Sequence, residues 1–181
     1  LNPEHGEAIL LLTTTSDELG IKFHKEGNHK SALKYFKLVT ILDPKEYLGF
    51  YNLGNTCLEL EDFKNAKTHY EKALSFEPEY EPALGNLAVV YRNLGKIEKT
   101  LSYYNKVIKI NPENPSNYYN KAVTLKEAER IDDAEENYRK AIRLDPKNIG
   151  SYHNLALINQ ERGQIKEGLD IIKKVLEFEA S

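Results

Sequence analysis

The sequence contains no methionine and no tryptophan, and Cys57 is its only cysteine. One cysteine cannot form an internal disulfide, which fits a reducing compartment, so we expect a cytoplasmic location. The longest apolar run near the N-terminus, residues 8–12, follows no Lys or Arg. Because this run is too short for a bilayer and lacks the basic start of a signal peptide, we expect no membrane insertion. The absence of methionine and the first residue, Leu1, indicate a processed product or a segment of a longer protein.

A strong excess of either charge is also absent. The chain has 25 basic and 28 acidic residues among 181, and its formal net charge is −3. A nucleic-acid partner would require a basic stripe that neutralises phosphates, so we predict no nucleic-acid binding. The composition of 40% hydrophobic and 29% charged residues is that of a soluble chain with a sizeable core.

Catalytic signatures are missing as well. The five histidines and Cys57 show no metal-ligand spacing, and no glycine-rich phosphate loop is present. Acidic pairs such as Asp132-Asp133 and Glu135-Glu136 fit the exposed faces of helices. We therefore predict that the chain is not an enzyme and holds neither a metal nor a cofactor.

What the sequence does contain is a period of 34 residues. YNLGN at 51–55 returns as GNLAV at 85–89, YNKAV at 119–123 and HNLAL at 153–157. Units of this length begin at Thr13, Tyr47, Glu81, Pro115 and Ile149 without insertions or deletions. Such self-similarity is typical of solenoids built from one repeated supersecondary unit.

Each unit carries two helical patterns. Apolar residues at positions 4, 7 and 11 share one face of a first helix, and those at positions 20, 24, 27 and 28 share a face of a second. Small residues at positions 8 and 20 allow the two helices to approach closely. The second helix is ended at position 32 by a proline in four of the units, namely Pro44, Pro78, Pro112 and Pro146.

These positions resemble the tetratricopeptide repeat (TPR) family over residues 13–181. The resemblance implies an all-α fold, a right-handed α–α superhelix (TPR solenoid) of five helix-turn-helix repeats. Its repeats would span 13–46, 47–80, 81–114, 115–148 and 149–181. Three positions depart from the family pattern: Ser16 replaces a large residue, Lys121 replaces leucine, and Asn159 replaces an aromatic residue.

The two ends are less regular. Residues 1–12 lie outside the repeat phase, and Asn2-Pro3-Glu4 has the form of a helix start, so we expect a short extra helix or arm that covers the first repeat. The last helix leaves a broad apolar face, which predicts either a capping helix that is missing here or pairing with another molecule, including a homo-oligomer formed through the C-terminal helix. This face is formed by Ile165, Leu169, Ile172, Val175, Leu176 and Phe178.

The first helix of each repeat has a second face, separate from its packing stripe. In the family this face lines the concave inner surface of the superhelix, where ligands bind. Positions 2, 6, 9 and 13 of the first helices share this face, and positions 5 and 12 add to it; we call this surface the groove face. Its candidate peptide-binding residues are Tyr51, Asn52, Asn55, Asn86, Val89, Arg92, Tyr119, Asn120, Val123, Lys126 and Asn154.

Asparagine occupies position 6 in repeats two to five and Glu18 occupies it in the first. Asparagine lowers helix propensity, but its side chain offers one acceptor and two donors, which match a peptide unit. This row is similar to the asparagine ladders that hold peptide backbone in the TPR superhelices of O-GlcNAc transferase and the peroxisomal import receptor. The alternative is that duplication has carried the four asparagines along without a function.

The carboxylate clamp of chaperone-binding TPR proteins fits less well. Asn55 and Asn86 match it, but Tyr51, Ser116 and Asn120 stand where that clamp requires cations. We therefore expect an extended segment of a partner protein rather than a chaperone tail.

Three functions remain open at this point. The resemblance favours an adaptor or scaffold that binds a peptide segment of a partner in the concave groove. The alternatives are a structural module that assembles through its apolar terminal repeat and a targeting domain of a larger enzyme.

Overall fold

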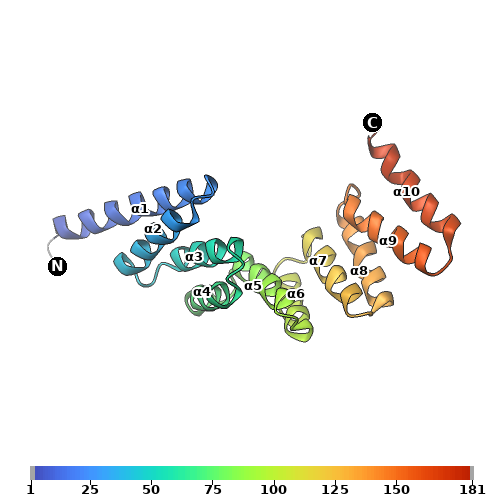
Figure 1. Ribbon diagram of the computed structural model, residues 1–181, viewed down its shortest axis with the longest axis horizontal. Helices are drawn as coiled ribbons and strands as arrows, with labels where there is room; N and C mark the ends of the chain where they lie inside the picture. Colours follow the sequence, from blue (N-terminus) through green and yellow to red (C-terminus); the bar gives the residue numbers. More distant parts are fainter. Residues whose placement is uncertain (1–2, 180–181) are drawn as a thin grey trace. The chain divides into compact units, whose positions relative to one another are not determined.

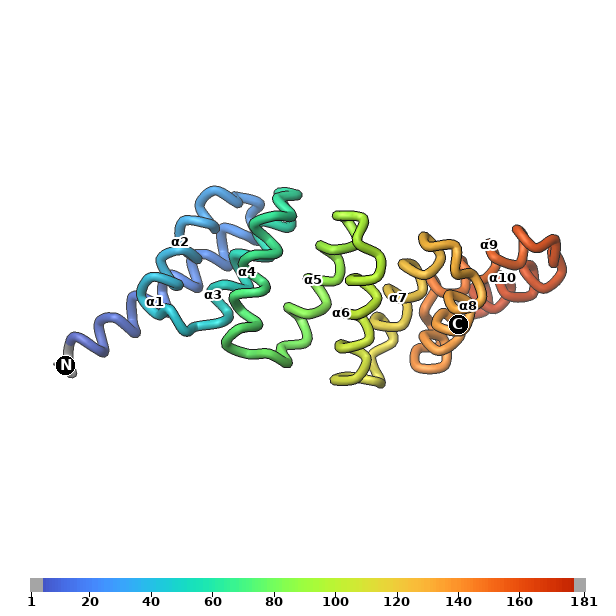
Figure 2. Tube along the Cα trace, turned by 90° about the horizontal axis from the view of Figure 1, so that it is seen from below, coloured from blue at the N-terminus to red at the C-terminus, as the bar shows by residue number. Residues whose placement is uncertain are grey.

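The computed structural model describes residues 3–179, and side chains over residues 5–177. The described chain is all helical and contains no strand (Figures 1 and 2). The helices are α1 (Pro3–Lys25), α2 (His29–Leu42), α3 (Tyr47–Glu59), α4 (Phe63–Phe76), α5 (Glu81–Asn93), α6 (Ile97–Ile110), α7 (Pro115–Glu127), α8 (Ile131–Leu144), α9 (Ile149–Glu161) and α10 (Ile165–Glu179).

The helix starts follow the sequence period. Helices α3, α5, α7 and α9 begin at Tyr47, Glu81, Pro115 and Ile149, which are the residues that open the second to fifth units. The even-numbered helices α2 to α10 form the second helix of each pair. The predicted all-α class with five helix-turn-helix repeats is therefore confirmed.

The turns inside the pairs require a left-handed residue at position 15. Gly27, Gly95 and Gly163 provide it with φ of 73°, 67° and 74°. Repeats two and four use Glu61 and Glu129 at the same position, with φ of 55° and 59°. A residue with a Cβ is strained in this conformation. In these two repeats the geometry of the turn therefore holds glutamate in a backbone conformation that it would not adopt by itself.

The chain divides into two compact units, one ending at Leu94 and the other beginning at Gly95. In the first unit, α1 to α5 pack as successive neighbours, with further contacts of α3 to α1 and α5. In the second unit, α6 to α10 pack in the same sequential way. Each interface is made by residues near in sequence, as expected for a solenoid in which a repeat contacts only its neighbours.

The two helices of a pair approach closely where position 8 meets position 24. A Cβ built on Gly20 would lie 2.5 Å from the Phe36 ring, and one built on Gly54 would lie 2.6 Å from the Tyr70 ring. Both aromatic side chains are fully buried in the core. In repeats one and two, glycine at position 8 thus lets a large ring fill the space between the helices.

The expectation of a short separate helix over residues 1–12 differs from the structure. Residues 3–12 form the first part of α1, which continues without interruption to Lys25. No proline or strong turn signal lies between residues 7 and 19 that would end the helix. The hydroxyls of Thr13 and Ser16 bond to the carbonyls of Ile9 and Leu12, four residues earlier, and are thereby accommodated inside the helix.

The last helix has the exposed apolar face that the sequence predicts. Ile165, Leu169, Ile172 and Leu176 are 54%, 53%, 45% and 58% exposed. Val175 is half-buried, and the side chain of Phe178 lies outside the described residues. Helix α10 is thus covered on one side by α9 and presents its other side to solvent.

Candidate functional site

All eleven predicted residues of the groove face lie on the first helices α3, α5, α7 and α9, and every one of them is half-buried. Such intermediate burial holds a side chain in place and leaves part of it accessible. In the first unit the structure brings several of these side chains into contact with one another. In the second unit the structure brings fewer of these side chains into contact with one another.

In the first unit, Asn55 is the centre of a small hydrogen-bond network. Its Oδ1 accepts a hydrogen bond from the Tyr70 hydroxyl at 2.8 Å and another from Nδ2 of Asn86 at 2.9 Å. The same Nδ2 lies 3.4 Å from the Tyr51 hydroxyl oxygen, to which it also donates. Asn86 therefore uses its amide group to bind the preceding repeat.

Asn52 is engaged in the same manner one repeat earlier. Its Nδ2 donates to Oδ1 of Asp17 on α1 at 3.1 Å. Burial raises the pKa of the Asp17 carboxyl, and the hydrogen bond from Asn52 acts in the opposite direction. Sequence reasoning missed Asp17 as a member of the site. The signal was available, because Asp17 and Tyr51 both occupy position 5 and both accept from position 6 of the next repeat.

In the second unit the amides are not held by neighbouring repeats. The Asn120 side chain makes no hydrogen bond to any of the described residues, and Nδ2 of Asn154 donates only to the Gly150 carbonyl of its own helix, at 2.9 Å. Both side chains are half-buried. Their remaining donors and acceptors therefore make no hydrogen bond to the described residues of the second unit.

The difference between the two units has a specific cause at position 9. Tyr138 corresponds to Tyr70 and is fully buried, but its hydroxyl finds no hydrogen-bond partner within the described part of the chain. Position 9 is Asn55 beside Tyr70 and Val123 in the repeat of Tyr138. Because valine has no acceptor, the hydroxyl lacks the partner that the first unit supplies.

Aromatic rings border the groove face in both units. The ring centroids of Tyr51 lie 5.9 Å from Tyr70 and 5.1 Å from Tyr80, and those of Tyr119 and Tyr138 lie 6.0 Å apart. Burial, followed by the neighbouring Tyr51 and Tyr119 respectively, raises the pKa of Tyr70 and Tyr138 above the usual tyrosine range. Both hydroxyls consequently remain protonated and neutral at physiological pH.

The two predicted cations of the groove face differ in their surroundings. Lys126 forms an ion pair with Glu161 of α9, with 3.8 Å between Nζ and Oε1. Arg92 is half-buried on the last turn of α5. A partly exposed pair of this length contributes little to stability, so Lys126 stays available to exchange partners.

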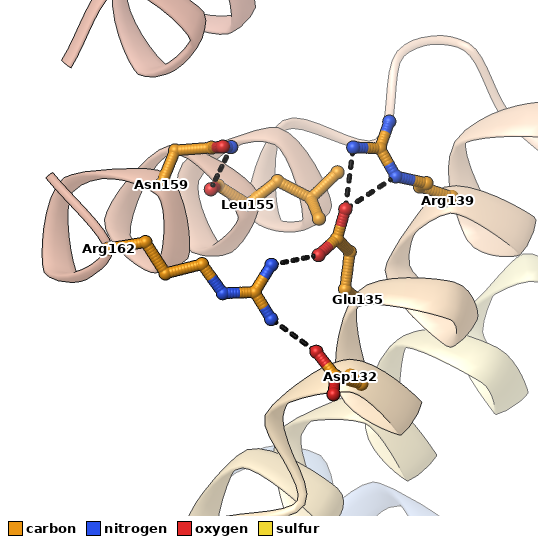
Figure 3. A network of polar contacts seen from close by, with 6 residues as sticks. All are labelled: Asp132, Glu135, Arg139, Leu155, Asn159 and Arg162. Carbon is orange, nitrogen blue, oxygen red and sulfur yellow. Dashed lines mark hydrogen bonds and ion pairs between the residues drawn. The ribbon is translucent and has the colours of Figure 1, made fainter. Parts of the chain in front are cut away.

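A polar network that the sequence did not predict joins α8 to the end of α9. Figure 3 shows Glu135 between two arginines: its Oε1 accepts from Arg139 at 2.6 Å, and its Oε2 accepts from Arg162 at 2.7 Å. Arg162 also binds Asp132. The hydrogen bond from Arg139, more than that from Arg162, holds the pKa of the Glu135 carboxyl below its usual range. This network fixes α9, the helix that carries Asn154, against α8.

Neither a metal centre nor a membrane span is found in the described chain. Over the described residues, no three His, Cys, Asp or Glu side chains gather closely enough to hold a metal ion. A search of the same part of the chain finds no helix with the length and apolarity needed to cross a membrane.

Comparison with known proteins identifies the repeat. A tetratricopeptide repeat model matches residues 47–80, 82–114 and 117–148, which is more than half of the chain, and a second tetratricopeptide repeat model matches residues 137–170. Human tetratricopeptide repeat protein 6 is 32% identical over 92 residues, and protein bimA of Emericella nidulans is 30% identical over 79 residues. These matches cover 49% and 44% of this chain, but only 18% and 10% of the length of those two proteins.

Solved structures share the architecture at lower identity. MamA from Desulfovibrio magneticus RS-1, from residue 41 to its end, is similar with a TM-score of 0.84 and 21% identity, over 93% of this chain and 96% of that one. YrrB, a TPR protein with an unusual peptide-binding site, is similar with a TM-score of 0.72 and 18% identity, over 90% and 84%. At these identities the likeness concerns the fold. By its repeat matches, the chain belongs to the tetratricopeptide repeat family.

Proposed function

We propose that the chain is a protein–protein interaction module that holds an extended segment of a partner protein in the concave groove lined by its first helices. The TPR fold supports a protein-interaction scaffold in general. The asparagines of position 6 are the specific feature from which we argue. We further propose that Asn120 and Asn154 of the second unit make the main contacts with the bound backbone.

The observation that carries this proposal is the unused hydrogen-bonding capacity of the second unit. Asn120 makes no side-chain hydrogen bond within the described residues, and Asn154 donates only within its own helix. An amide of this kind pairs with a peptide unit through one donor and one acceptor. Two such pairings say little about the bound side chains, so the groove would accept many sequences in an extended conformation.

The first unit would contribute differently. Asn52 and Asn86 already donate to Asp17 and Asn55, which positions their amides and leaves their Oδ1 atoms as acceptors. They would accept hydrogen bonds from backbone N–H groups but supply fewer donors. A side chain that is already held loses less conformational entropy on binding, so these two amides would be preorganised contacts within the first unit.

Hydrogen bonds alone would not give tight binding. At about 1 kcal/mol each, four amide contacts supply about 4 kcal/mol, which corresponds to millimolar affinity. Apolar and aromatic side chains beside the ladder, namely Tyr51, Val89, Tyr119 and Val123, would supply the remainder by contacting side chains of the ligand. YrrB, which shares the fold, is described as having a peptide-binding site, and this supports a peptide ligand here as well.

The test uses peptides selected from a random library on the purified chain, with affinity measured by fluorescence anisotropy. We expect the double variant N120A/N154A to lose at least about tenfold in affinity, with an unchanged circular dichroism spectrum. T68A is the control, because Thr68 on α4 also donates to a carbonyl of its own helix, that of Lys64 at 3.0 Å, and lies outside the groove face. Equal affinity of N120A/N154A and wild type for the selected peptides would contradict the proposal.

A further inference from the structure

A polar cavity of about 790 Å³ lies in the second unit and is separate from the groove face. Its walls come from α6 and α8 and its floor from α7. The volume falls within the range of clefts that bind small ligands or single side chains of a partner. The lining residues are Glu98, Leu101, Ser102, Asn105, Lys106, Lys109, Tyr118, Lys121, Leu125, Arg130, Asp133, Glu136 and Asn137.

Lys121 lies at the floor of this cavity and occupies position 7 of its repeat. Repeats two, three and five carry leucine at that position: Leu53, Leu87 and Leu155, which are only 1%, 0% and 2% exposed. Lys121 is half-buried instead, and burial lowers its pKa. Lys121 thus brings an ammonium group to a position at which repeats two, three and five bury a leucine, and it lines the polar space there.

Two of the charged side chains around Lys121 form an ion pair with each other. Arg130 binds Asp133, with 2.7 Å between Nη2 and Oδ2. Lys121 itself forms no ion pair within the described residues, although Asp133 and Glu136 lie near enough to oppose its loss of a proton. The remaining charged groups that face the space are Glu98, Lys106 and Lys109 on α6.

The net charge of the lining residues favours binding of a singly charged anion. Four cations and three carboxylates line the cavity, so its local charge is positive by one in a chain whose net charge is negative. A half-buried ammonium without a partner is costly, and an incoming carboxylate would remove that cost through a charge-assisted hydrogen bond. A single carboxylate brings this local charge to zero, whereas a doubly charged phosphate would leave it negative.

The neutral lining fits a polypeptide. Ser102 and Asn105 offer hydrogen bonds for a backbone, while Leu101, Leu125 and the Tyr118 ring provide apolar contact for the stem of a side chain. We propose that this cavity binds an acidic side chain of a partner protein, with its carboxylate on Lys121. Neighbouring residues of a helix are about 100° apart, so α7 carries Asn120 toward the groove face and Lys121 toward this second site.

The test uses two capped peptides, Gly-Ser-Glu-Ser-Gly and its twin with glutamine in place of glutamate. Titration of the isotope-labelled chain to about 10 mM peptide is followed by nuclear magnetic resonance. We expect the glutamate peptide to shift amide resonances of α6, α7 and α8, and the glutamine twin and inorganic phosphate to leave them in place.

The variants separate a binding site from surface attraction. K121Q should weaken the response to the glutamate peptide by at least about tenfold, whereas K64Q, which removes an exposed charge on α4, should not. N120A/N154A should leave this response intact, so failure here is distinguishable from failure of the groove. Absence of shifts up to the final concentration, equal shifts by both peptides, or an unchanged response in K121Q would each overturn the proposal.

Discussion

Position 9 decides whether the buried tyrosine at position 24 of repeats two and four has a hydrogen-bond acceptor. Asn55 accepts from Tyr70 and from Asn86, whereas Val123 leaves the Tyr138 hydroxyl without a partner in the described chain. The sequence separations are the same in both units, 15 residues to the tyrosine and 31 to the asparagine of the next repeat. The two sites therefore form a natural pair for exchange of one residue.

We predict opposite effects for the two exchanges. N55V leaves the Tyr70 hydroxyl and the Asn86 amide without their acceptor, which should lower the free energy of unfolding by about 2 kcal/mol. V123N supplies an acceptor to Tyr138 and should raise it by about 1 kcal/mol. Urea unfolding followed by circular dichroism measures both. A stabilising N55V or a strongly destabilising V123N would contradict the role given to position 9.

Lys121 provides a second prediction at the scale of one residue. Replacing it by leucine restores the residue of the other repeats, so K121L should be more stable by about 2 kcal/mol at neutral pH. The pKa of Lys121 is lowered in the folded chain, because burial disfavours the charged form. Protonated Lys121 therefore destabilises the fold below that lowered pKa, and the penalty disappears as pH rises from it toward the ordinary value of 10.5.

The measurement is the difference in unfolding free energy between wild type and K121L as a function of pH. Using the difference removes the titration of tyrosines that both proteins share. The gap should be constant near neutral pH and close as the pH approaches 10.5. If this difference in unfolding free energy increased with rising pH, it would contradict the destabilisation of the fold by protonated Lys121.

At the scale of helices, the distance between the two members of a pair depends on position 8. Gly54 lies against the Tyr70 ring, which is also held by its hydrogen bond to Asn55. Repeats three and four accommodate Ala88 and Ala122 at the same position. Alanine is thus compatible with the fold where the two helices leave space for its Cβ. Between α3 and α4 the Tyr70 ring occupies that space, so glycine is required.

We predict that G54A destabilises the chain by about 1–2 kcal/mol, because the added Cβ must displace the Tyr70 ring. Gly85 on α5 is the matched control, since a Cβ built there meets no atom within 4 Å. G85A should leave stability unchanged or raise it by up to about 1 kcal/mol through better helix propensity. Thermal unfolding of both variants tests this, and equal effects would contradict the close approach of α3 and α4.

Much of this element-level structure could be predicted from the sequence. The starts of α3, α5, α7 and α9 followed from the period, because core positions, turns and prolines all repeat together. The helix start expected near Pro3 agrees with α1, but the sequence did not predict that residues 3–12 continue into the first repeat, since the repeat phase begins at Thr13 while the helix has no physical reason to break there.

The positions of the candidate residues on the helices could be predicted from the sequence, but their contacts could not. The sequence placed eleven residues on one face, and all are half-buried. Which amides are already bonded depends on partners in the preceding repeat, as with Asp17 for Asn52 and Asn55 for Asn86. The departure at Lys121 was visible, but the cavity beside it arises from how α6 and α8 pack, which no single repeat specifies.

For the whole molecule, the two terminal helices present unlike surfaces. Positions 3 and 10 of the first helices are buried in repeats two to five, for example Ala83 and Val90, because they face the preceding repeat. In α1 these positions are Thr15 and Lys22, both exposed. At these two positions α1 thus offers no apolar surface to the face of α10, although Leu10, Leu11 and Leu12 elsewhere on α1 are exposed.

End-to-end growth through the repeat geometry is accordingly not expected. We expect a second copy to cover α10 by pairing with the same face, and such a twofold contact closes at a dimer. Sedimentation velocity at increasing protein concentration should show no species larger than a dimer. A ladder of higher oligomers would show that α1 accepts α10 in spite of Thr15 and Lys22.

The central claim is that asparagine side chains hold the backbone of a bound segment, and a double-mutant cycle tests it most directly. One change is N120A; the other is N-methylation of the backbone amides of a selected peptide, one at a time, which removes a single donor. We expect one methylated position to give a coupling energy of at least about 1 kcal/mol with N120A, because both changes remove the same hydrogen bond. Strict additivity at every backbone position would contradict it.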